Sequence, residues 1–301
     1  MDSYKMTKAE KEYLSQYHIE DFERPSIATD IAIFSILNEG VQEDIRKLQK
    51  KSLKLLLIKR GSYPYKDNWA LPGGFCKPGE DVIETAKREL FEETNVENAY
   101  LQLVGVYGEK DRDPRGWIIS NTFMALMDGK ACKLRAGTDA WEARWFHVSV
   151  EQNEVKREVF ADRITLETEH ILELVNEELG ISLKAKIKEY TSFQNYHESV
   201  RYEILDRDCL AFDHARIILE ALLTLRKNVE NDPKQIFDLM PELFTLTQLQ
   251  NAFEIVLDQK LVPANFRRKI GKYVLETEQI MDGAGFRPAK LFRRNVEKFY
   301  R

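Results

Sequence analysis

The sequence predicts an α+β protein that has a layered N-terminal domain and a smaller, basic C-terminal domain. Apolar, β-branched runs around one strongly amphipathic helix at 79–95 predict the layered domain, because each such element buries its apolar face against another. The 301 residues, 43% of them hydrophobic, suffice for two domains with buried cores. Residues 260–301 hold eleven Lys and Arg against four Asp and Glu, a net charge of +7. Residues 1–259 then carry −12, because the whole chain carries −5.

Six stretches of the N-terminal domain have the apolar, β-branched composition of strands. They are 26–37, 52–60, 68–75, 101–109, 116–128 and 142–148. Helices are predicted at 41–51, 79–95 and 210–231, the last from apolar residues that recur every three or four positions. Residues 150–206 mix helical and strand-like patterns, and we interpret them as an insertion in a domain that spans 1–231.

The C-terminal domain is predicted at 232–301. The segment DPKQIF, at its start, contains a proline and marks the boundary. Beyond it the pattern indicates a helix, a second helix and then strands. Thr245 or Thr247 and Pro263 are the expected helix starts, because Thr caps a helix N-terminus and Pro suits the first turn.

Composition argues against several classes of protein. The chain has no apolar run of the roughly 18 residues that a membrane-spanning helix needs. Its first residues are polar and charged, unlike a secretory signal peptide. Cys76, Cys132 and Cys209 are far apart and odd in number, which fits neither a disulfide framework nor a CxxC metal site. We therefore expect a protein of the reducing cytoplasm.

Three carboxylates crowd the C-terminal half of the helix at 79–95. Glu89, Glu92 and Glu93 are spaced i, i+3 and i+4, so they project from one side of the helix, off its apolar face. Hard oxygen ligands in this arrangement suit Mg²⁺ or Mn²⁺, which keep water and substrate phosphates in their remaining positions. The alternative is a solvated acidic face. Arg88 lies one turn after Glu84 and is placed to hold a neighbouring carboxylate.

The spacing around these carboxylates resembles the Nudix box, GX5EX7REUXEEXGU, in which U is aliphatic. Gly74, Glu80, the run 88–93 and Val96 match it, and Asn95 stands where the family has glycine. Asn is the residue other than Gly that best tolerates the left-handed conformation that ends a helix. We therefore expect the shape of the box to be kept.

This resemblance implies an α/β/α Nudix sandwich with a mixed sheet, acting on a nucleoside diphosphate that is linked to another group. In the family, the residues that match Glu89, Glu92 and Glu93 hold Mg²⁺ or Mn²⁺, which neutralises the diphosphate and activates water. The residue that matches Arg88 orients these carboxylates. The backbone carbonyl near Gly74 joins the coordination.

The loop EKDRDPRGW, which we name the DRDPRG loop, carries Arg112 and Arg115 between two predicted strands. It resembles the loop of Nudix proteins that act on or sense ADP-ribose, and guanidinium groups suit phosphate and ribose oxygens. The alternative is a polar hairpin loop. The rings of Trp69, Phe75 and Trp117 are candidates to stack on a base, and the buried core is the alternative for each.

The stretches FTLTQLQ, NFRRKI and RPAKLFR resemble the winged helix-turn-helix of the Nudix-related transcriptional regulators. The resemblance implies that the second helix enters the major groove of double-stranded DNA, with the wing on the backbone. The candidate DNA-binding residues are Asn265, Arg267, Arg268, Lys269, Lys272, Arg287 and Lys290. The alternative is a solvated basic face. The charge of +7 argues against that alternative, because phosphate contacts supply most non-specific affinity for DNA.

Three functions follow from these patterns. The first is a Mg²⁺-dependent Nudix hydrolase, with ADP-ribose as favoured substrate, that also binds DNA and regulates transcription. The second is a non-catalytic regulator whose Nudix domain only binds ADP-ribose or a related effector, and the third is an interaction module without either role. The presence of all the box carboxylates favours the first. By analogy with winged-helix regulators that read two half-sites, we expect a homodimer.

Overall fold

The computed structural model describes residues 5–39, 50–97, 99–129, 140–281 and 288–299. Its strands are β1 (Ser26–Asn38), β2 (Lys51–Arg60), β3 (Trp69–Ala70), β4 (Gly73–Phe75), β5 (Tyr100–Tyr107), β6 (Ile118–Leu126), β7 (Ala140–Val159), β8 (Arg163–Asn176), β9 (Ile181–Gln194), β10 (His197–Asp206), β11 (Val274–Met281) and β12 (Ala289–Arg294). Its helices are α1 (Lys8–Gln16), α2 (Val82–Thr94), α3 (His214–Asn231), α4 (Leu246–Leu257) and α5 (Pro263–Ile270), with short 3-10 helices η1 (Ile19–Asp21), η2 (Pro233–Leu239), η3 (Gly271–Tyr273) and η4 (Val296–Lys298).

In the described ranges no helix is long and apolar enough to cross a membrane. The helix predicted at 41–51 lies outside the described residues, except for its last two.

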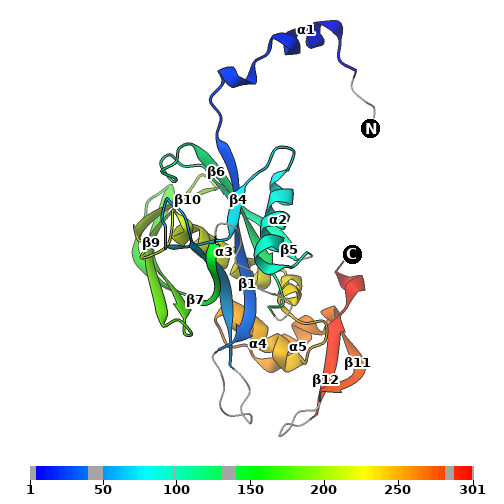
Figure 1. The fold of residues 1–301 in the computed structure, drawn as a ribbon. Helices are drawn as coiled ribbons and strands as arrows, with labels where there is room; N and C mark the ends of the chain where they lie inside the picture. The colour runs from blue at the N-terminus through cyan, green and yellow to red at the C-terminus, as the bar shows by residue number, and fades with distance from the viewer. Residues whose placement is uncertain (1–4, 40–49, 98, 130–139, 282–287, 300–301) are drawn as a thin grey trace.

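Strands β1 to β10 form one mixed sheet (Figure 1). Its order is β10–β9–β8–β7–β2–β1–β6–β5, with β3 paired to β2 and β4 paired to β1. β1 and β6 run parallel, from Ser26 beside Ile118 to Phe34 beside Leu126. The other neighbours are antiparallel. The predicted mixed sheet is therefore confirmed.

β1 is buried on both faces and lies at the centre of the layers. Ile31 and Ile33 share one buried cluster with Leu90 of α2, whereas Phe34 shares another with Leu222 of α3. Because successive side chains of a strand point to opposite faces, α2 and α3 cover opposite sides of the sheet. This layering confirms the predicted α/β/α sandwich.

Residues 150–206 extend the same sheet. Buried and half-buried positions alternate along β8, and Leu172 and Leu174 belong to the buried cluster that contains α3. The helical part of the pattern predicted for this segment is wrong, because residues 163–183 form β8, a turn and the start of β9. A period of two in the apolar residues outweighs the helical propensity of its many Glu and Leu residues.

The C-terminal part has the predicted order of two helices and a two-stranded wing, β11 and β12 (Figure 1). Thr245 caps α4 through a capping box with Gln248, and Pro263 is the first residue of α5, so both helix starts agree with the sequence. Leu249 and Phe266 belong to the same buried cluster as α3. The winged helix therefore shares a continuous core with the sheet.

Helix α1 extends away from the rest of the protein at the N-terminal end of β1 (Figure 1). None of its nine residues is buried. The Tyr17 ring contacts the rings of Tyr13 and Phe22, and all three remain exposed. The described part of the chain therefore leaves apolar surface of residues 8–22, the N-terminal arm, uncovered.

Candidate functional site

Side-chain and backbone caps close both ends of the helix that carries the Nudix box. The Asp81 carboxylate accepts from the backbone N–H groups of Ile83 and Glu84, and the Glu84 carboxylate accepts from the backbone N–H of Asp81. Glu84, for which the sequence suggested a pair with Arg88, therefore serves this capping box. At the other end Asn95 adopts the left-handed conformation, with φ 57° and ψ 28°. The role predicted for Asn95 at the family's glycine position is confirmed.

The inward face of α2 is partly acidic. Ala86 and Leu90 pack against the sheet. Glu89 and Glu93 are also buried, with 9% and 6% of their surface exposed. The prediction that the acidic residues lie off the buried face is therefore wrong for these two. Ile83 and Phe91 of the same helix are exposed.

Gly74 makes the burial of Glu89 possible. β4 pairs with β1, which places Gly74 beside Thr29 and under the Glu89 carboxylate. A Cβ atom at position 74 would lie 2.1 Å from Oε1 of Glu89. Only glycine leaves that space, so the box Gly and the first of its three glutamates fit together as one unit.

Arg88 binds three carboxylates of the box at once. Its Nε and Nη2 donate to both oxygens of Glu80, at 2.9 and 3.1 Å. Its Nη1 donates to Oε1 of Glu89 at 2.6 Å and to Oε1 of Glu92 at 3.5 Å. Its Nη2 also donates to the backbone carbonyl of Phe75 at 3.2 Å. Arg88 thus orients the carboxylates, the role that the resemblance implied for it.

Replacing Glu80 with glutamine is expected to lower stability near neutral pH, and the loss should shrink in acid. Arg88 holds the pKa of Glu80 at about 2, whereas a free glutamate has a pKa of about 4.3. The carboxylate therefore stabilises the fold above pH 4.3 or so and loses this effect as the pH falls towards 2. Thermal unfolding at several pH values in this range measures it. A deficit that stays constant with pH would contradict it, and Glu97→Gln is the exposed control.

The box residues offer the right donors for a divalent cation. Glu89, Glu92 and Glu93 supply carboxylate oxygens, which Mg²⁺ and Mn²⁺ prefer, and burial raises the pKa of Glu89. Across the described ranges, however, the structure shows no three His, Cys, Asp or Glu side chains arranged to hold a metal. Arg88 instead binds an oxygen of Glu89 and one of Glu92. These carboxylates are therefore suitable ligands for the metal. In this structure, the side chains of Glu89 and Glu92 are oriented towards Arg88.

The two arginines of the DRDPRG loop have different environments. The Arg112 side chain is 6% exposed and makes a two-pronged ion pair with Asp213, at 2.9 and 2.7 Å. Arg115 is 40% exposed and binds Asp113 through Nη2 at 2.6 Å. Arg112 therefore ties the loop to the start of α3, while Arg115 lies at the surface where a ligand can reach it.

The three candidate aromatic rings also differ. Trp69 is 3% exposed and packs edge-on against Phe146, with 4.8 Å between ring centroids, so its ring belongs to the core. Phe75 and Trp117 are 42% and 56% exposed, so the core alternative does not apply to them. The guanidinium of Arg115 lies 5.1 Å from the centroid of Phe75. Phe75 and Arg115 thus form a surface pair next to the box.

The start of α3 contributes polar residues to which the sequence gave no site role. The backbone N–H of Leu71 donates to Nδ1 of His214 at 2.9 Å, and Nε2 lies 3.7 Å from Oδ1 of Asp30. Burial lowers the pKa of His214, so the ring packs as a neutral imidazole. The contact between Arg112 and Asp213 spans 101 positions, and no local pattern signals it.

Helix α5 presents a basic outer surface because its apolar side chains face inward. Phe266 and Ile270 are buried, whereas Asn265, Arg267 and Arg268 are exposed. At about 100° per residue, Arg268 lies opposite the buried pair. Nη2 of Arg268 donates to Oδ1 of Asn265 at 3.3 Å. The core anchors the helix and leaves this outer surface open.

The remaining candidate DNA-binding residues have other contacts. Nζ of Lys269 donates to a backbone carbonyl in the last turn of α3, at 3.3 Å. Lys272 lies over the neighbouring tyrosine ring, 4.9 Å from its centroid, and Lys290 pairs with Glu276 across the wing. Arg287 lies outside the described residues.

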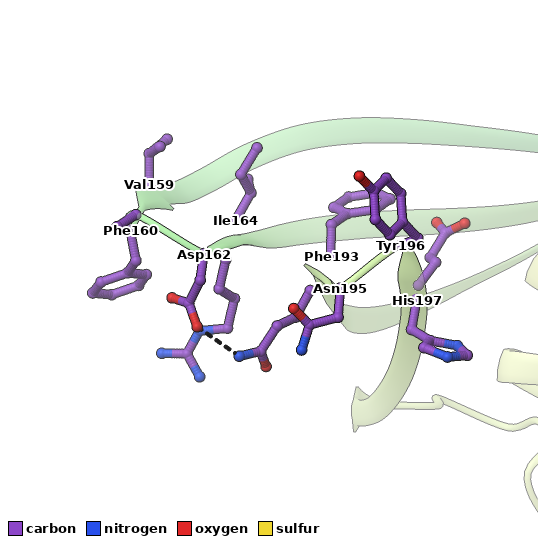
Figure 2. A pocket seen from close by; sticks show the side chains of 12 residues that line it. Val159, Phe160, Asp162, Ile164, Phe193, Asn195, Tyr196 and His197 are labelled. Atoms are coloured by element: carbon purple, nitrogen blue, oxygen red, sulfur yellow. Dashed lines mark hydrogen bonds between the residues drawn. The ribbon is translucent and has the colours of Figure 1, made fainter.

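A hollow of about 510 Å³ lies between the ends of the β7–β8 and β9–β10 hairpins (Figure 2). Phe160 and Tyr196 are exposed there, and Nε2 of Gln194 donates to Oδ2 of Asp162 between the hairpins, at 2.9 Å. None of its lining residues belongs to the box or to the DRDPRG loop. The hollow is therefore no part of the candidate site.

Fold and site together define a Nudix domain joined to a winged helix. Residues 45–165 match the Nudix domain family, and residues 236–294 match the NrtR DNA-binding winged helix domain. The chain is 30% identical over 294 residues to the ADPR responsive transcriptional repressor NtrR of Acinetobacter baylyi, covering 97% of this chain and 90% of that protein. The chain therefore belongs to the NrtR family of Nudix-related transcriptional regulators.

Two further similarities extend this comparison. An ADP-ribose pyrophosphatase of Methanocaldococcus jannaschii is 46% identical over 100 residues, 33% of this chain and 58% of that protein. The crystal structure of Shewanella oneidensis NrtR has the same fold, with a TM-score of 0.57 and 23% identity over 90% of this chain and 94% of that one. That protein complexed with a 27mer DNA gives a TM-score of 0.54 at 22% identity, with the same coverage of both chains.

Proposed function

We propose that this protein is a DNA-binding transcription regulator whose Nudix domain binds ADP-ribose, or a related nucleoside diphosphate, as its effector. The observation that carries the proposal is that a Nudix box with all its carboxylates lies on the same sheet whose other face shares one core with a winged helix, on which Arg267 and Arg268 are exposed. The similarity to an ADPR responsive repressor along almost the whole chain supports it.

Helix α3 connects the two parts of this proposed regulator. At its start Asp213 holds Arg112 of the DRDPRG loop. Near its end, Nε of Arg226 donates to the carbonyl of Val256 in α4 at 3.1 Å. A ligand that binds two arrangements of the DRDPRG loop unequally shifts their populations. Because α3 contacts both the loop and α4, such a shift can alter the position of the winged helix.

Two binding measurements on one preparation test this function. A labelled fragment of DNA from upstream of the gene is expected to shift with the full-length protein. Calorimetry with the α,β-methylene analogue of ADP-ribose, which cannot be cleaved at the diphosphate, is expected to show saturable binding. If the DNA fragment does not shift, the DNA-binding role is rejected. If calorimetry shows no binding of the analogue, the effector role is rejected.

Hydrolysis is a second candidate, favoured by the complete set of box carboxylates and by the similarity to an ADP-ribose pyrophosphatase. Glu89, Glu92 and Glu93, with the backbone of Gly74, would hold Mg²⁺ or Mn²⁺. The metal would neutralise the diphosphate and lower the pKa of a bound water. Arg88, whose guanidinium donates to Glu80 and Glu89, would orient the carboxylates.

Mg²⁺-dependent release of AMP from ADP-ribose is the expected activity. Glu93→Gln is expected to remove it, because the substitution takes away a charged ligand and leaves the helix intact, and Glu92→Gln should do the same. Chromatography of the nucleotide products measures the release, with the exposed Glu97→Gln as control. If the wild-type protein with Mg²⁺ releases no AMP, the protein is a regulator without this activity.

We expect the protein to act as a homodimer. A two-fold arrangement would let two copies of α5 read two half-sites, and the exposed rings of Tyr13, Tyr17 and Phe22 on the N-terminal arm offer apolar surface for a second copy. Light scattering is expected to give about twice the 35.2 kDa chain mass. A mass of one chain at micromolar concentration would contradict this expectation.

A further inference from the structure

Three arginines from separate segments lie on two aromatic rings that contact each other, Tyr65 and Phe212. Arg60 ends β2, Arg115 lies in the DRDPRG loop and Arg207 follows β10. The guanidinium carbons of Arg60 and Arg115 lie 4.9 and 5.4 Å from the centroid of the Phe212 ring. Nη1 of Arg207 donates to the carbonyl of Phe212 at 3.2 Å and to the hydroxyl of Tyr65 at 3.1 Å. We name these five residues the arginine cluster.

The two aromatic residues of the arginine cluster have an uncommon backbone conformation. Tyr65 and Phe212 have φ of 59° and 52°, in the left-handed region that bulky residues rarely occupy. Their rings meet edge-on with 4.8 Å between centroids, and Arg207 lies 4.8 Å from the centroid of Tyr65. Residues held in such conformations occur preferentially at ligand sites. The strain therefore points to a role beyond packing.

The arginine cluster borders the Nudix box through Phe75. Arg115 lies over the Phe75 ring as well as over Phe212. The carbonyl of Phe75 accepts from Nη2 of Arg88, the residue that orients the box carboxylates. A ligand bound at the box would therefore reach the cluster along this exposed ring.

Charge identifies the chemistry that the arginine cluster suits. Like charges repel at these separations, and Arg115 is offset by its ion pair with Asp113. Arg207 donates to two neutral oxygens. Guanidinium groups bind phosphate oxygens with two parallel hydrogen bonds. A phosphate would thus add negative charge beside three cations that lie on two touching rings.

Resting on the proposed function, we propose that Arg60, Arg115 and Arg207 bind the phosphate oxygens of the nucleoside diphosphate that the Nudix domain takes. Phe212 and Tyr65 hold the guanidinium groups in position. The cluster makes the domain selective for the charge of the diphosphate.

Calorimetry of the full-length protein with two probes tests this role. The probes are the α,β-methylene analogue of ADP-ribose and adenosine, which has no phosphate. Arg60→Gln and Arg207→Gln are each expected to weaken binding of the analogue about tenfold or more, since each removes charged hydrogen bonds. Adenosine binding should stay unchanged. Arg144→Gln removes an arginine that pairs with Glu142 on β7 and is the matched control.

A structural role gives a different result. Because Arg207 also hydrogen-bonds to Tyr65 and Phe212, thermal unfolding is recorded for every variant. Arg207→Lys is measured alongside, because it keeps the charge and loses the paired N–H donors of the guanidinium group. Folded variants with wild-type affinity for the analogue would overturn the arginine cluster and leave the proposed function standing. Equal losses for adenosine and the analogue would also overturn it. A wild-type protein that binds neither probe would overturn both proposals.

Discussion

Replacing Arg267 and Arg268 together with alanine is expected to weaken binding to upstream DNA by at least about tenfold, and by much more if both side chains reach bases. Both side chains lie on the exposed surface of α5, while Phe266 and Ile270 anchor the helix in the core. The variant should therefore fold normally and lose affinity alone. Fluorescence anisotropy of labelled DNA measures the change.

A control separates this effect from the loss of two charges. Arg157→Ala with Arg163→Ala removes the same charge from the β7–β8 hairpin, and only the long-range part of the attraction should fall. The α5 variant should also have a shallower dependence of affinity on salt, because it makes fewer phosphate contacts. Equal effects of the two double variants would contradict a recognition role for α5.

Replacing Arg112 with alanine is expected to lower the free energy of unfolding by about 3–5 kcal/mol, the usual cost of leaving one partner of a buried ion pair without the other. The Arg112 and Asp213 side chains are 6% and 12% exposed and form two hydrogen bonds. Without the guanidinium, the Asp213 carboxylate would remain buried at the start of α3. Urea denaturation measures the loss.

The companion experiment removes both charges. Arg112→Met with Asp213→Asn is expected to recover much of the stability lost in the single variant, because no buried charge is left unpaired. A single variant as stable as the wild type would show that the DRDPRG loop does not depend on this pair. The loop would then be free to place Arg112 on a ligand, as the sequence suggested.

Features set by neighbouring residues were predictable from the sequence. The spacing of Glu89, Glu92 and Glu93 needs only the helical repeat. The left-handed Asn95 and the start of α5 at Pro263 follow from the conformational limits of single residue types. The box, both helix starts and the layered fold were therefore found without coordinates.

Features set by distant contacts were not predictable. Arg112 meets Asp213 across 101 positions, and the arginine cluster joins three segments that only the fold brings together. Arg88 could be named as an orienting residue, yet its bond to Glu80, eight positions away, depends on how the turn before α2 folds back. Single-residue rules carry no information on such pairings.

We expect one ligand site to control one DNA interface through α3, which contacts both the DRDPRG loop and α4. The affinity for upstream DNA should be measured by anisotropy with and without a saturating concentration of the α,β-methylene analogue, with AMP as control. The affinity is expected to change at least about fivefold with the analogue, which is the lower end of usual coupling energies. Superimposable DNA-binding curves, obtained while calorimetry shows the analogue bound, would contradict it.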